Sequence, residues 1–338
     1  MIKKKTDIRS RPNQKDMKIL EVLYNSKKFN KLETETKKLI QKHPNVAPLL
    51  NILGFALHKQ GHLEKAATNY EQAISIDPKF IFAHNNLGNI FKDLGKFDEA
   101  LSKYQHSIKL NPNYAEAYYN QGLVYRKIRE YNESIKSFQY ALKIKPDFLK
   151  CWYSLGLARS DEGDKEGALD AFNQVIEIDS SYVKAYSSLA EIYIGLKEYT
   201  KAFEVLNTAT KIDSSYSKSY LMLGIVYTEL NQFEEAVDNL EKGVALNPKD
   251  AKSWFRLAHA HNELGNCEAA QNAAREAVDR KKNFGGGWYE LGIAEWCKGD
   301  GNKTVALNSL EKARNDRSWR KMAEYEIDKI NNPHKYVE

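Results

Sequence analysis

The sequence contains little cysteine, no long apolar run and no secretory leader. Its three cysteines, Cys151, Cys267 and Cys297, are far apart in the chain, so we expect neither a disulfide framework nor a Cys-x-x-Cys metal site. No apolar run approaches the ~20 residues that cross a bilayer, and the segment MIKKKTDIRSRP has no apolar core behind its cations. These absences argue against membrane-spanning and secreted proteins and predict a cytoplasmic protein in a reducing compartment.

The chain has no large excess of positive or negative charge. Lys and Arg number 51 and Asp and Glu number 45, a net charge of +6. Residues 1–12 carry five cations and the single acid Asp7, so they account for +4 and the remaining chain for only +2. Because phosphate binding needs a clear surplus of cations, no nucleic-acid partner is expected. We expect residues 1–12 to be a disordered, solubilising basic arm; contact with anionic lipid or nucleic acid, and a mitochondrial presequence, are weaker alternatives.

Motifs of catalysis and cofactor binding are missing as well. The patterns GxGxxG, GxxxxGK[ST] and GxSxG do not occur. His58 and His62 have the spacing of a helical metal pair, but Gly61 indicates a turn that takes His62 off the helix. We therefore expect no enzyme, no metal and no cofactor. Cys151 is expected to be a buried, inert thiol, and His84 to be a packing residue.

A single period, roughly 34 residues long, organises the chain. Its markers are Pro44, Pro78, Pro112 and Pro146, and Gly54, Gly88, Gly122 and Gly156. Alanine or glycine continues the glycine register at positions 190, 224, 258 and 292. Two unrelated residue types that keep one period indicate a solenoid of stacked repeats.

Each repeat predicts two amphipathic helices. In residues 81–114, apolar residues recur at helical spacing before Gly95 and again between Gly95 and Pro112. Gly95 permits the left-handed conformation that ends a helix, and Pro112 disfavours helix in the residue before it. The repeat is therefore expected to fold as a helical hairpin.

Small residues predict close packing between the helices of a repeat. We expect Gly88 to lie where the backbone of a second helix comes close, with Ala100 facing it, since larger side chains would push the helices apart. Aromatic residues of the second helices are expected to fill the space between neighbouring repeats: Tyr70, Tyr104, Phe138 and Phe172.

This pattern resembles the tetratricopeptide repeat, W-x2-L-G-x2-Y followed by A-x3-F and by A and P. Residues 217–250 match it at Tyr220, Leu223, Gly224, Tyr227, Ala236 and Pro248. Residues 115–148 match it at Tyr118, Gly122, Tyr125, Phe138, Ala141 and Pro146, and depart from it at Gln121 and Ser134. The resemblance covers about residues 13–318 and implies an all-α fold, an α-solenoid in which antiparallel helix pairs stack into a right-handed superhelix.

The register also predicts the organisation of the chain. A degenerate repeat is expected at 13–46, seven regular repeats at 47–284, and a repeat with a two-residue insertion in its turn at 285–318. Residues 319–338 are expected to form a capping helix and tail, because the last repeat would otherwise expose its apolar side.

The resemblance implies that the first helices line a concave groove that binds a partner. The groove residues expected by register are Asn85, Asn86, Asn89, Lys92, Tyr119, Asn120, Arg126, Lys150 and Tyr153, with Lys252 and Arg256 as a separate basic step that suits an acidic partner. Side-chain amides offer both a donor and an acceptor, which suits a peptide backbone. We expect a non-enzymatic scaffold or adaptor that binds another protein through an extended segment, with self-association left open.

Aromatic residues recur at one place on the first helices. They are Tyr119, Tyr153, Phe255 and Tyr289, joined by Trp296. Exposed aromatic residues anchor many interfaces, whereas a tyrosine at this place can also pack against its neighbours. Both interpretations stay open from the sequence.

Two alternative functions rest on the same residues. A clamp for the acidic C-terminal tails of chaperones is matched at Asn89, Asn120 and Lys150, but Asn85 and Ser154 replace the expected cations and remove most charge-assisted bonding. This co-chaperone hypothesis is therefore disfavoured.

The second alternative is a substrate-recruiting regulatory subunit. Asn86 and Asn120, within segments such as HNNLGNIFKDLGKFDEA, look like the arrays of O-linked N-acetylglucosamine transferases and of related bacterial glycosyl- or sulfotransferases. That resemblance implies a catalytic domain on a separate chain.

Overall fold

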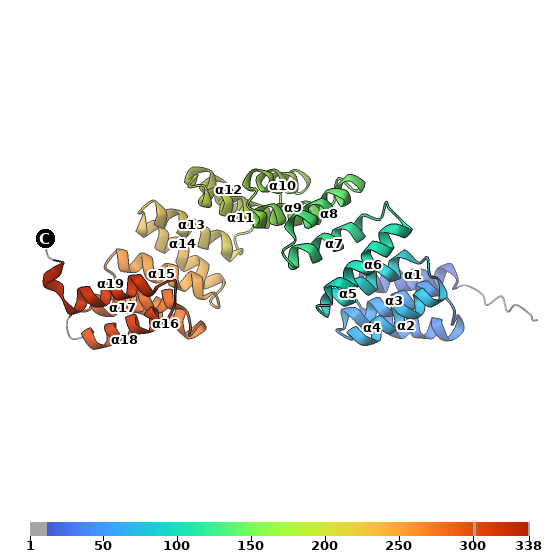
Figure 1. The fold of residues 1–338 in the computed structure, drawn as a ribbon, viewed down its shortest axis with the longest axis horizontal. Helices are drawn as coiled ribbons and strands as arrows, with labels where there is room; N and C mark the ends of the chain where they lie inside the picture. The colour runs from blue at the N-terminus through green and yellow to red at the C-terminus, as the bar shows by residue number, and fades with distance from the viewer. Residues whose placement is uncertain (1–11, 300–301, 337–338) are drawn as a thin grey trace, which may run out of the picture. The chain divides into compact units, whose positions relative to one another are not determined.

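The computed structural model describes residues 12–299 and 302–336, and all their regular elements are helices (Figure 1). In chain order they span α1 Gln14–Asn25, α2 Phe29–Lys42, α3 Ala47–Lys59, α4 Leu63–Ile76, α5 Ile81–Asp93, α6 Phe97–Leu110, α7 Ala115–Lys127, α8 Tyr131–Ile144, α9 Leu149–Glu162, α10 Lys165–Ile178, α11 Val183–Gly195, α12 Tyr199–Ile212, α13 Ser217–Glu229, α14 Phe233–Leu246, α15 Ala251–Glu263, α16 Cys267–Arg280, α17 Gly285–Cys297, α18 Lys303–Arg314, α19 Arg320–Asn331 and the 3-10 turn η2 Pro333–Lys335. Consecutive helices pack against one another from α1 to α9 and from α11 to α19, which confirms the predicted all-α solenoid.

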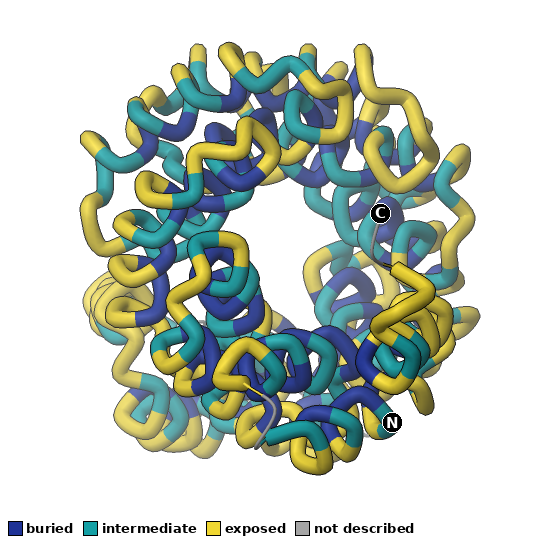
Figure 2. Tube along the Cα trace, turned by 90° about the vertical axis from the view of Figure 1, so that its left-hand side faces the viewer, coloured by how far each residue is buried: buried dark blue, intermediate teal, exposed yellow. Residues whose placement is uncertain are grey.

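The chain forms two compact bodies, an N-terminal body of residues 1–171 and a C-terminal body of residues 172–338. The division falls within α10, and each body is described by itself. In both bodies an odd-numbered helix contacts its pair partner and also the next odd-numbered helix, as α3 contacts α5 and α13 contacts α15. The odd-numbered helices of each body therefore form one layer. Buried and exposed residues alternate along the helices, as amphipathic stacking requires (Figure 2).

The turn within a pair needs one residue in the left-handed region. Gly95 fills that place with φ of 74°, as its position in the sequence predicts. Other pairs use a residue with a side chain at the same place, such as Arg129 with φ of 66° and Lys197 with φ of 61°. A non-glycine residue costs about 1–2 kcal/mol in this conformation. The surrounding helix packing, rather than the turn residue, therefore decides where these helices end.

In several pairs a first-helix residue shares one space with the residue sixteen positions later. A Cβ on Gly88 would lie 2.6 Å from the ring of Tyr104, and a Cβ on Gly122 would lie 2.6 Å from the ring of Phe138. The prediction of a close backbone approach at Gly88 was wrong, because the neighbour is a side-chain ring. These rings also fill space within their own pair, and not only between neighbouring repeats as predicted.

The two partners of this space compensate in size. Where the second helix carries leucine, the first carries alanine in the buried pair Ala190 and Leu206 and glycine in the pair Gly224 and Leu240. Where the first and second helices both carry alanine, at Ala258 and Ala274, both residues are fully buried in one cluster. The summed volume of the two residues varies from pair to pair, but neither partner is large when the other is not small.

A second recurring contact ties four of the described first helices, α5, α9, α15 and α17, to the turns before them. The ring N–H groups of Trp152, Trp254 and Trp288 donate to the carbonyl six residues earlier, at 2.7, 2.9 and 2.7 Å. His84 occupies the same place, with Nε2 2.9 Å from the carbonyl oxygen of Pro78. Burial lowers the pKa of His84, in line with the packing role predicted for it.

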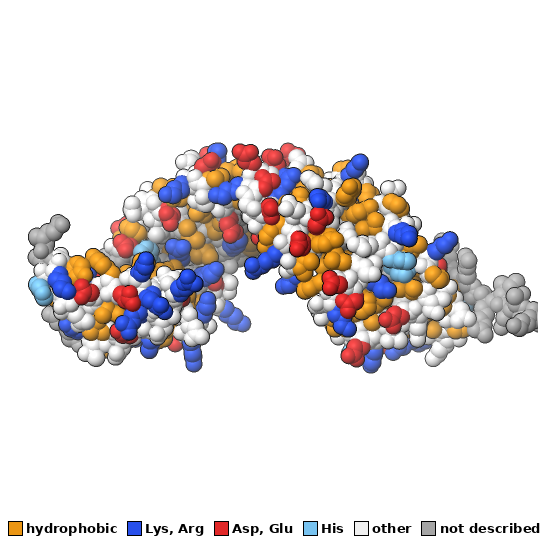
Figure 3. All heavy atoms as spheres, in the orientation of Figure 1, with side chains coloured by type: hydrophobic (Ala, Val, Ile, Leu, Met, Phe, Trp, Pro, Cys, Tyr) orange, Lys and Arg blue, Asp and Glu red, His pale blue; other side chains and the backbone are white. Residues whose placement is uncertain are grey.

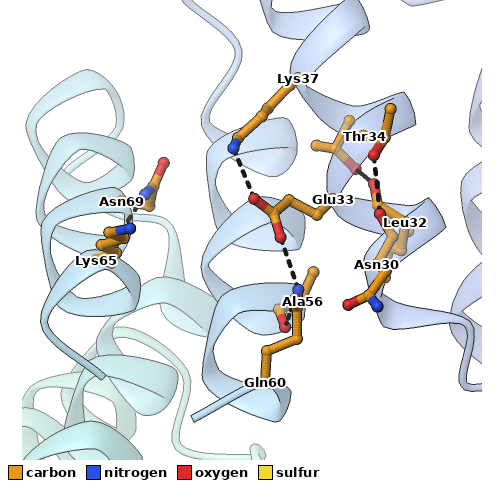
Figure 4. Close-up of polar contacts among 10 residues, drawn as sticks. Asn30, Leu32, Glu33, Thr34, Lys37, Ala56, Gln60, Lys65 and Asn69 are labelled. Carbon is orange, nitrogen blue, oxygen red and sulfur yellow. Dashed lines mark hydrogen bonds and ion pairs between the residues drawn. The ribbon is translucent and has the colours of Figure 1, made fainter. Parts of the chain in front are cut away.

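In the first pair a carboxylate joins α2 to α3 (Figure 4). Glu33 accepts a hydrogen bond from Lys37 Nζ at 2.6 Å and from Gln60 Nε2 at 2.8 Å. The bond from Lys37, and then the bond from Gln60, hold the pKa of Glu33 below its ordinary value. Leu32, which replaces the usual alanine here, is fully buried, so this pair keeps an apolar core despite its divergent sequence.

The C-terminal body contains a disulfide that the sequence analysis excluded. Cys267 begins α16, Cys297 ends α17, and their Cα atoms lie 5.6 Å apart in a disulfide. The prediction was wrong because thirty residues of separation hide two positions that lie at the same end of neighbouring helices. Cys151 is fully buried, and burial raises its pKa to about 12, so its thiol stays protonated.

The ends of the chain fall partly outside the described residues. Residues 1–11 of the expected basic arm are not described, and neither are residues 300–301 in the turn expected to hold the insertion. α17 ends at Cys297 and α18 begins at Lys303, whereas α15 ends at Glu263 and α16 begins at Cys267. After α18, the helix α19 packs against it and buries Ala323 and Ile330.

Candidate binding surface

Four asparagine side chains on three successive first helices form a hydrogen-bonded ladder in the N-terminal body. Asn86 Nδ2 on α5 donates to Asn51 Oδ1 on α3 at 2.9 Å. Asn120 Nδ2 on α7 donates to Asn85 Oδ1 at 3.0 Å, and Asn85 Nδ2 reaches Asn86 Oδ1 at 3.4 Å. These residues are called the amide ladder below. The side chains run continuously from α3 to α7.

The ladder fixes the orientation of its amides. Part of their hydrogen-bonding capacity remains available for a partner. A side-chain amide has two N–H hydrogens and two lone pairs, and the inner amides, Asn85 and Asn86, use one donor and one acceptor each. Asn85 is 4% exposed, so it positions its neighbours instead of meeting a partner. Asn51, Asn86 and Asn120 are partly exposed. Sequence reasoning missed Asn51, although it lies one repeat of 34 residues before the predicted Asn85.

Two other residues predicted for the groove are held by contacts within the body. Asn89 Oδ1 accepts a hydrogen bond from the hydroxyl of Tyr104 at 2.8 Å. The ring of Tyr119 lies 4.9 Å from that of Phe148, and burial raises the pKa of Tyr119 while a hydrogen bond with Ser154 opposes the rise. For Tyr119 the structure therefore favours the packing interpretation. The amide oxygen of Asn89 is occupied by the hydroxyl of Tyr104.

Two basic side chains on this layer lie against carboxylates 35 residues further along the chain. Arg126 Nε lies 2.6 Å from Asp161 Oδ2, and His58 Nε2 lies 2.7 Å from Asp93 Oδ2. Burial lowers the pKa of Lys92, whose Nζ is 3.9 Å from Asp93 Oδ1. On the face in Figure 3, acidic and basic side chains are interspersed over this body.

The chaperone-tail clamp finds little support in these positions. Asn85 and Ser154 are buried, and Asn89 is engaged by Tyr104. Of the five clamp positions, only Lys150 presents a cation on the surface. Tyr153, next to Ser154, is partly buried. A pair of carboxylates would meet a single charge here.

Lys252 and Arg256 belong to the C-terminal body, where they line a groove of about 540 Å³ over α11, α13 and α15. Its apolar floor includes Leu221, Met222 and Ile225. This groove is separate from the ladder surface. The predicted site residues thus fall on two surfaces, one in each body.

A buried polar cluster in the C-terminal body was not predicted. Glu290 on α17 is 3% exposed, and its carboxylate lies 3.1 Å from His259 Nδ1 and 2.7 Å from Asn262 Nδ2 on α15. The hydrogen bond with Glu290 is the main cause that raises the pKa of His259. The sequence offsets of Glu290 from His259 and Asn262, 31 and 28, do not follow the repeat, so the period could not have revealed the cluster.

This cluster gives the C-terminal body a predicted dependence on pH. Because the folded pKa of His259 is raised, the protonated pair stabilises the fold below the ordinary histidine pKa of about 6.5. That contribution is lost as the pH rises from about 6.5 through the raised value. We expect urea unfolding, followed by circular dichroism, to show lower stability at pH 8 than at pH 6. His259→Gln should flatten this dependence, and an unchanged slope in that variant would contradict the assignment.

Helical hairpins of one recurring length, stacked through a layer of first helices, define a helical-repeat protein. Family models described as TPR repeat match residues 54–95, 88–128 and 224–265, and models described as tetratricopeptide repeat match 115–148, 153–217 and 251–284. The chain belongs to the tetratricopeptide repeat family. None of the curated proteins matches the chain.

Solved structures of the same fold show little sequence identity. The crystal structure of the APC/C hetero-tetramer Cut9-Hcn1 matches with a TM-score of 0.57 and 16% identity, over 88% of this chain and 59% of that chain. A tetratricopeptide repeat protein from Parabacteroides merdae matches with a TM-score of 0.53 and 19% identity, over 73% and 98%. YrrB, described as a TPR protein with an unusual peptide-binding site, matches with 0.46 and 21%, over 54% and 95%. At these identities the likeness extends to the fold alone.

None of the described helices is both long and apolar enough to cross a membrane. Within residues 12–299 and 302–336, no group of three or more His, Cys, Asp or Glu side chains is arranged to hold a metal ion. His62, the second member of the sequence-level histidine pair, is the residue before α4 and so lies outside the helix that carries His58.

Proposed function

We propose that this chain is a non-enzymatic scaffold that binds an extended segment of a partner protein along the first helices of its N-terminal body. The amide ladder carries the proposal. Its outward members, Asn51, Asn86 and Asn120, lie on three successive first helices and are oriented by hydrogen bonds within the ladder. Amides held in this way lose little conformational freedom when they bind a partner.

The spacing of the ladder suits a peptide backbone. Packed helices lie about 8–10 Å apart, so α3 to α7 spans roughly 20 Å. An extended chain rises about 3.3 Å per residue, and roughly six residues would cross this distance. The donor and acceptor that the ladder amides retain match the N–H and C=O of a backbone. Binding of this kind recognises an extended conformation more than a particular sequence.

A triple substitution tests the proposal. Asn51→Ala, Asn86→Ala and Asn120→Ala together remove the outward amides, each worth about 0.5–1.5 kcal/mol, so we expect partner affinity to fall at least tenfold. The measurement is affinity purification with mass spectrometry, followed by titration of the captured partner.

The chain offers a matched control on the outer layer. Asn69 on α4 is partly exposed, and its Nδ2 donates only to the carbonyl of Lys65 within its own helix, at 2.8 Å (Figure 4). Asn69→Ala should leave the captured partners unchanged. Partners that survive the triple substitution at full affinity would show that the ladder is not the binding surface.

A further inference from the structure

A second concave site lies in the C-terminal body, between α15, α17 and α19. It is a cleft of about 420 Å³ with aromatic walls, contributed by Phe255, Tyr289, Trp296 and Trp319. The ring of Trp319, at the start of α19, lies 5.5 Å from that of Phe255 and 5.2 Å from that of Tyr289. Met322, 47% exposed, and Ile293 complete the apolar lining.

Three carboxylates belong to this cleft. Glu263 on α15 has a side chain that is 47% exposed, Glu326 on α19 one that is 14% exposed, and Glu290 is buried. Burial and then the charges of these three residues raise the pKa of the Tyr289 hydroxyl, as expected where negative charge gathers.

Three basic side chains, Arg256, His259 and Lys329, line the cleft beside its three carboxylates. Lys329 Nζ lies 3.7 Å from Glu326, and His259 is bonded to Glu290. The guanidinium of Arg256 lies 5.5 Å from the ring centre of Phe255, on the side that also lines the neighbouring groove. Among the described residues, the basic group recorded beside Glu263 is His259, at 4.0 Å. An exposed carboxylate next to aromatic faces is therefore available to a ligand.

We propose that this cleft binds an arginine or lysine side chain of a partner polypeptide, with the aliphatic stem against Trp296 and Met322 and the cationic head at Glu263 and Glu326. Aromatic faces attract cations, and carboxylates form the strongest hydrogen bonds that a guanidinium makes. The site is distinct from the amide ladder and does not depend on the function proposed for it. The cleft would recognise a charged side chain of a partner, whereas the amide ladder would recognise its backbone.

Tryptophan signals provide a direct test in the full chain. The protein is labelled with 5-fluorotryptophan and titrated, by fluorine NMR, with a blocked pentapeptide that has a central arginine between glycines. The matched probe carries citrulline, which is neutral and has nearly the same shape. Trp152, Trp254 and Trp288 are bonded to backbone carbonyls outside the cleft and act as internal references.

We expect the arginine peptide to shift the signals of Trp296 and Trp319 saturably, and the citrulline peptide to bind at least about fivefold more weakly. Equal binding of the two peptides, or no shift of these two signals at 10 mM arginine peptide, would overturn the proposal. Both comparisons use the unaltered protein, so neither depends on whether a variant folds.

Charge removal locates the head group. Glu263→Gln with Glu326→Gln should weaken binding of the arginine peptide about three- to tenfold, while the shifts keep their pattern. The control is Glu241→Gln with Glu268→Gln, which removes the same charge from exposed places on α14 and α16. If the control pair weakens binding as much as the cleft pair, the attraction is a long-range effect of net charge and the proposed contact is wrong.

Discussion

Gly122→Ala is expected to destabilise the N-terminal body by about 1–3 kcal/mol, although alanine is the better helix former. The added methyl group would lie 2.6 Å from the ring of Phe138, which is fully buried and has no room to withdraw. The expected result is a lower midpoint of urea unfolding, measured by circular dichroism at 222 nm.

A compensating change separates this steric cause from other effects. Phe138→Leu alone leaves a cavity and should also destabilise the body, by about 1 kcal/mol. The double variant Gly122→Ala with Phe138→Leu reproduces the pair that the chain itself uses at Ala190 and Leu206. We expect it to recover about 1–2 kcal/mol relative to the sum of the single variants. Strict additivity would show that the two residues do not share one space.

Gly243 provides a control of the opposite sign. A Cβ there would meet its nearest neighbour, the backbone nitrogen of Leu221, at 3.4 Å, which is ordinary contact. The equivalent places in other pairs hold the fully buried alanines Ala209 and Ala277. Gly243→Ala should therefore stabilise the C-terminal body by about 0.5–1 kcal/mol, because glycine weakens a helix interior.

The sequence predicted helices, turns and the stacking order because these depend on a period that every repeat shares. It did not predict which group faces Gly88, because a glycine indicates a close contact without indicating whether a backbone or a side chain makes that contact. The partner sixteen positions later could have been inferred from co-variation of size within the chain itself, as the pairs Gly122 with Phe138 and Ala190 with Leu206 show.

The site was predicted in part for a similar reason. Register placed Asn86 and Asn120 on the correct layer, but contacts between neighbouring first helices join residues whose sequence offset is 35. That offset connects Asn51 to Asn86 and Arg126 to Asp161, and a search at the repeat period alone misses it. The cleft was harder to predict, because Trp319 reaches it from the start of α19, beyond the regular array.

Two glycines at the start of α17, Gly285 and Gly286, make close contacts that the sequence does not predict. A Cβ on Gly286 would lie 2.9 Å from the ring of Trp319 and 3.0 Å from that of Phe255. The backbone N–H of Gly285 donates to Asp316 Oδ2 at 3.3 Å. Glycines at the start of a helix are unfavourable by propensity, and only the tertiary contact explains them.

Reduction of the Cys267–Cys297 disulfide is expected to destabilise the C-terminal body by about 3.5 kcal/mol. The bond joins cysteines with a sequence separation of 30, and in the chain-entropy account a loop of that size restrains the unfolded state by roughly this amount. The urea midpoint should fall when dithiothreitol is added and recover on reoxidation. Cys151, fully buried and with a raised pKa, should stay unmodified by a thiol reagent in the folded protein.

The variant Cys267→Ser with Cys297→Ser should have the lower urea midpoint of the reduced protein, and dithiothreitol should not change it. A variant as stable as the oxidised protein would contradict the prediction. Under reducing conditions the bond opens, and the packing of α16 against α17 alone then holds this end of the body. Since Cys297 lines the cleft and follows Trp296 directly, the oxidised and reduced forms should then differ in affinity for the arginine peptide as well as in stability.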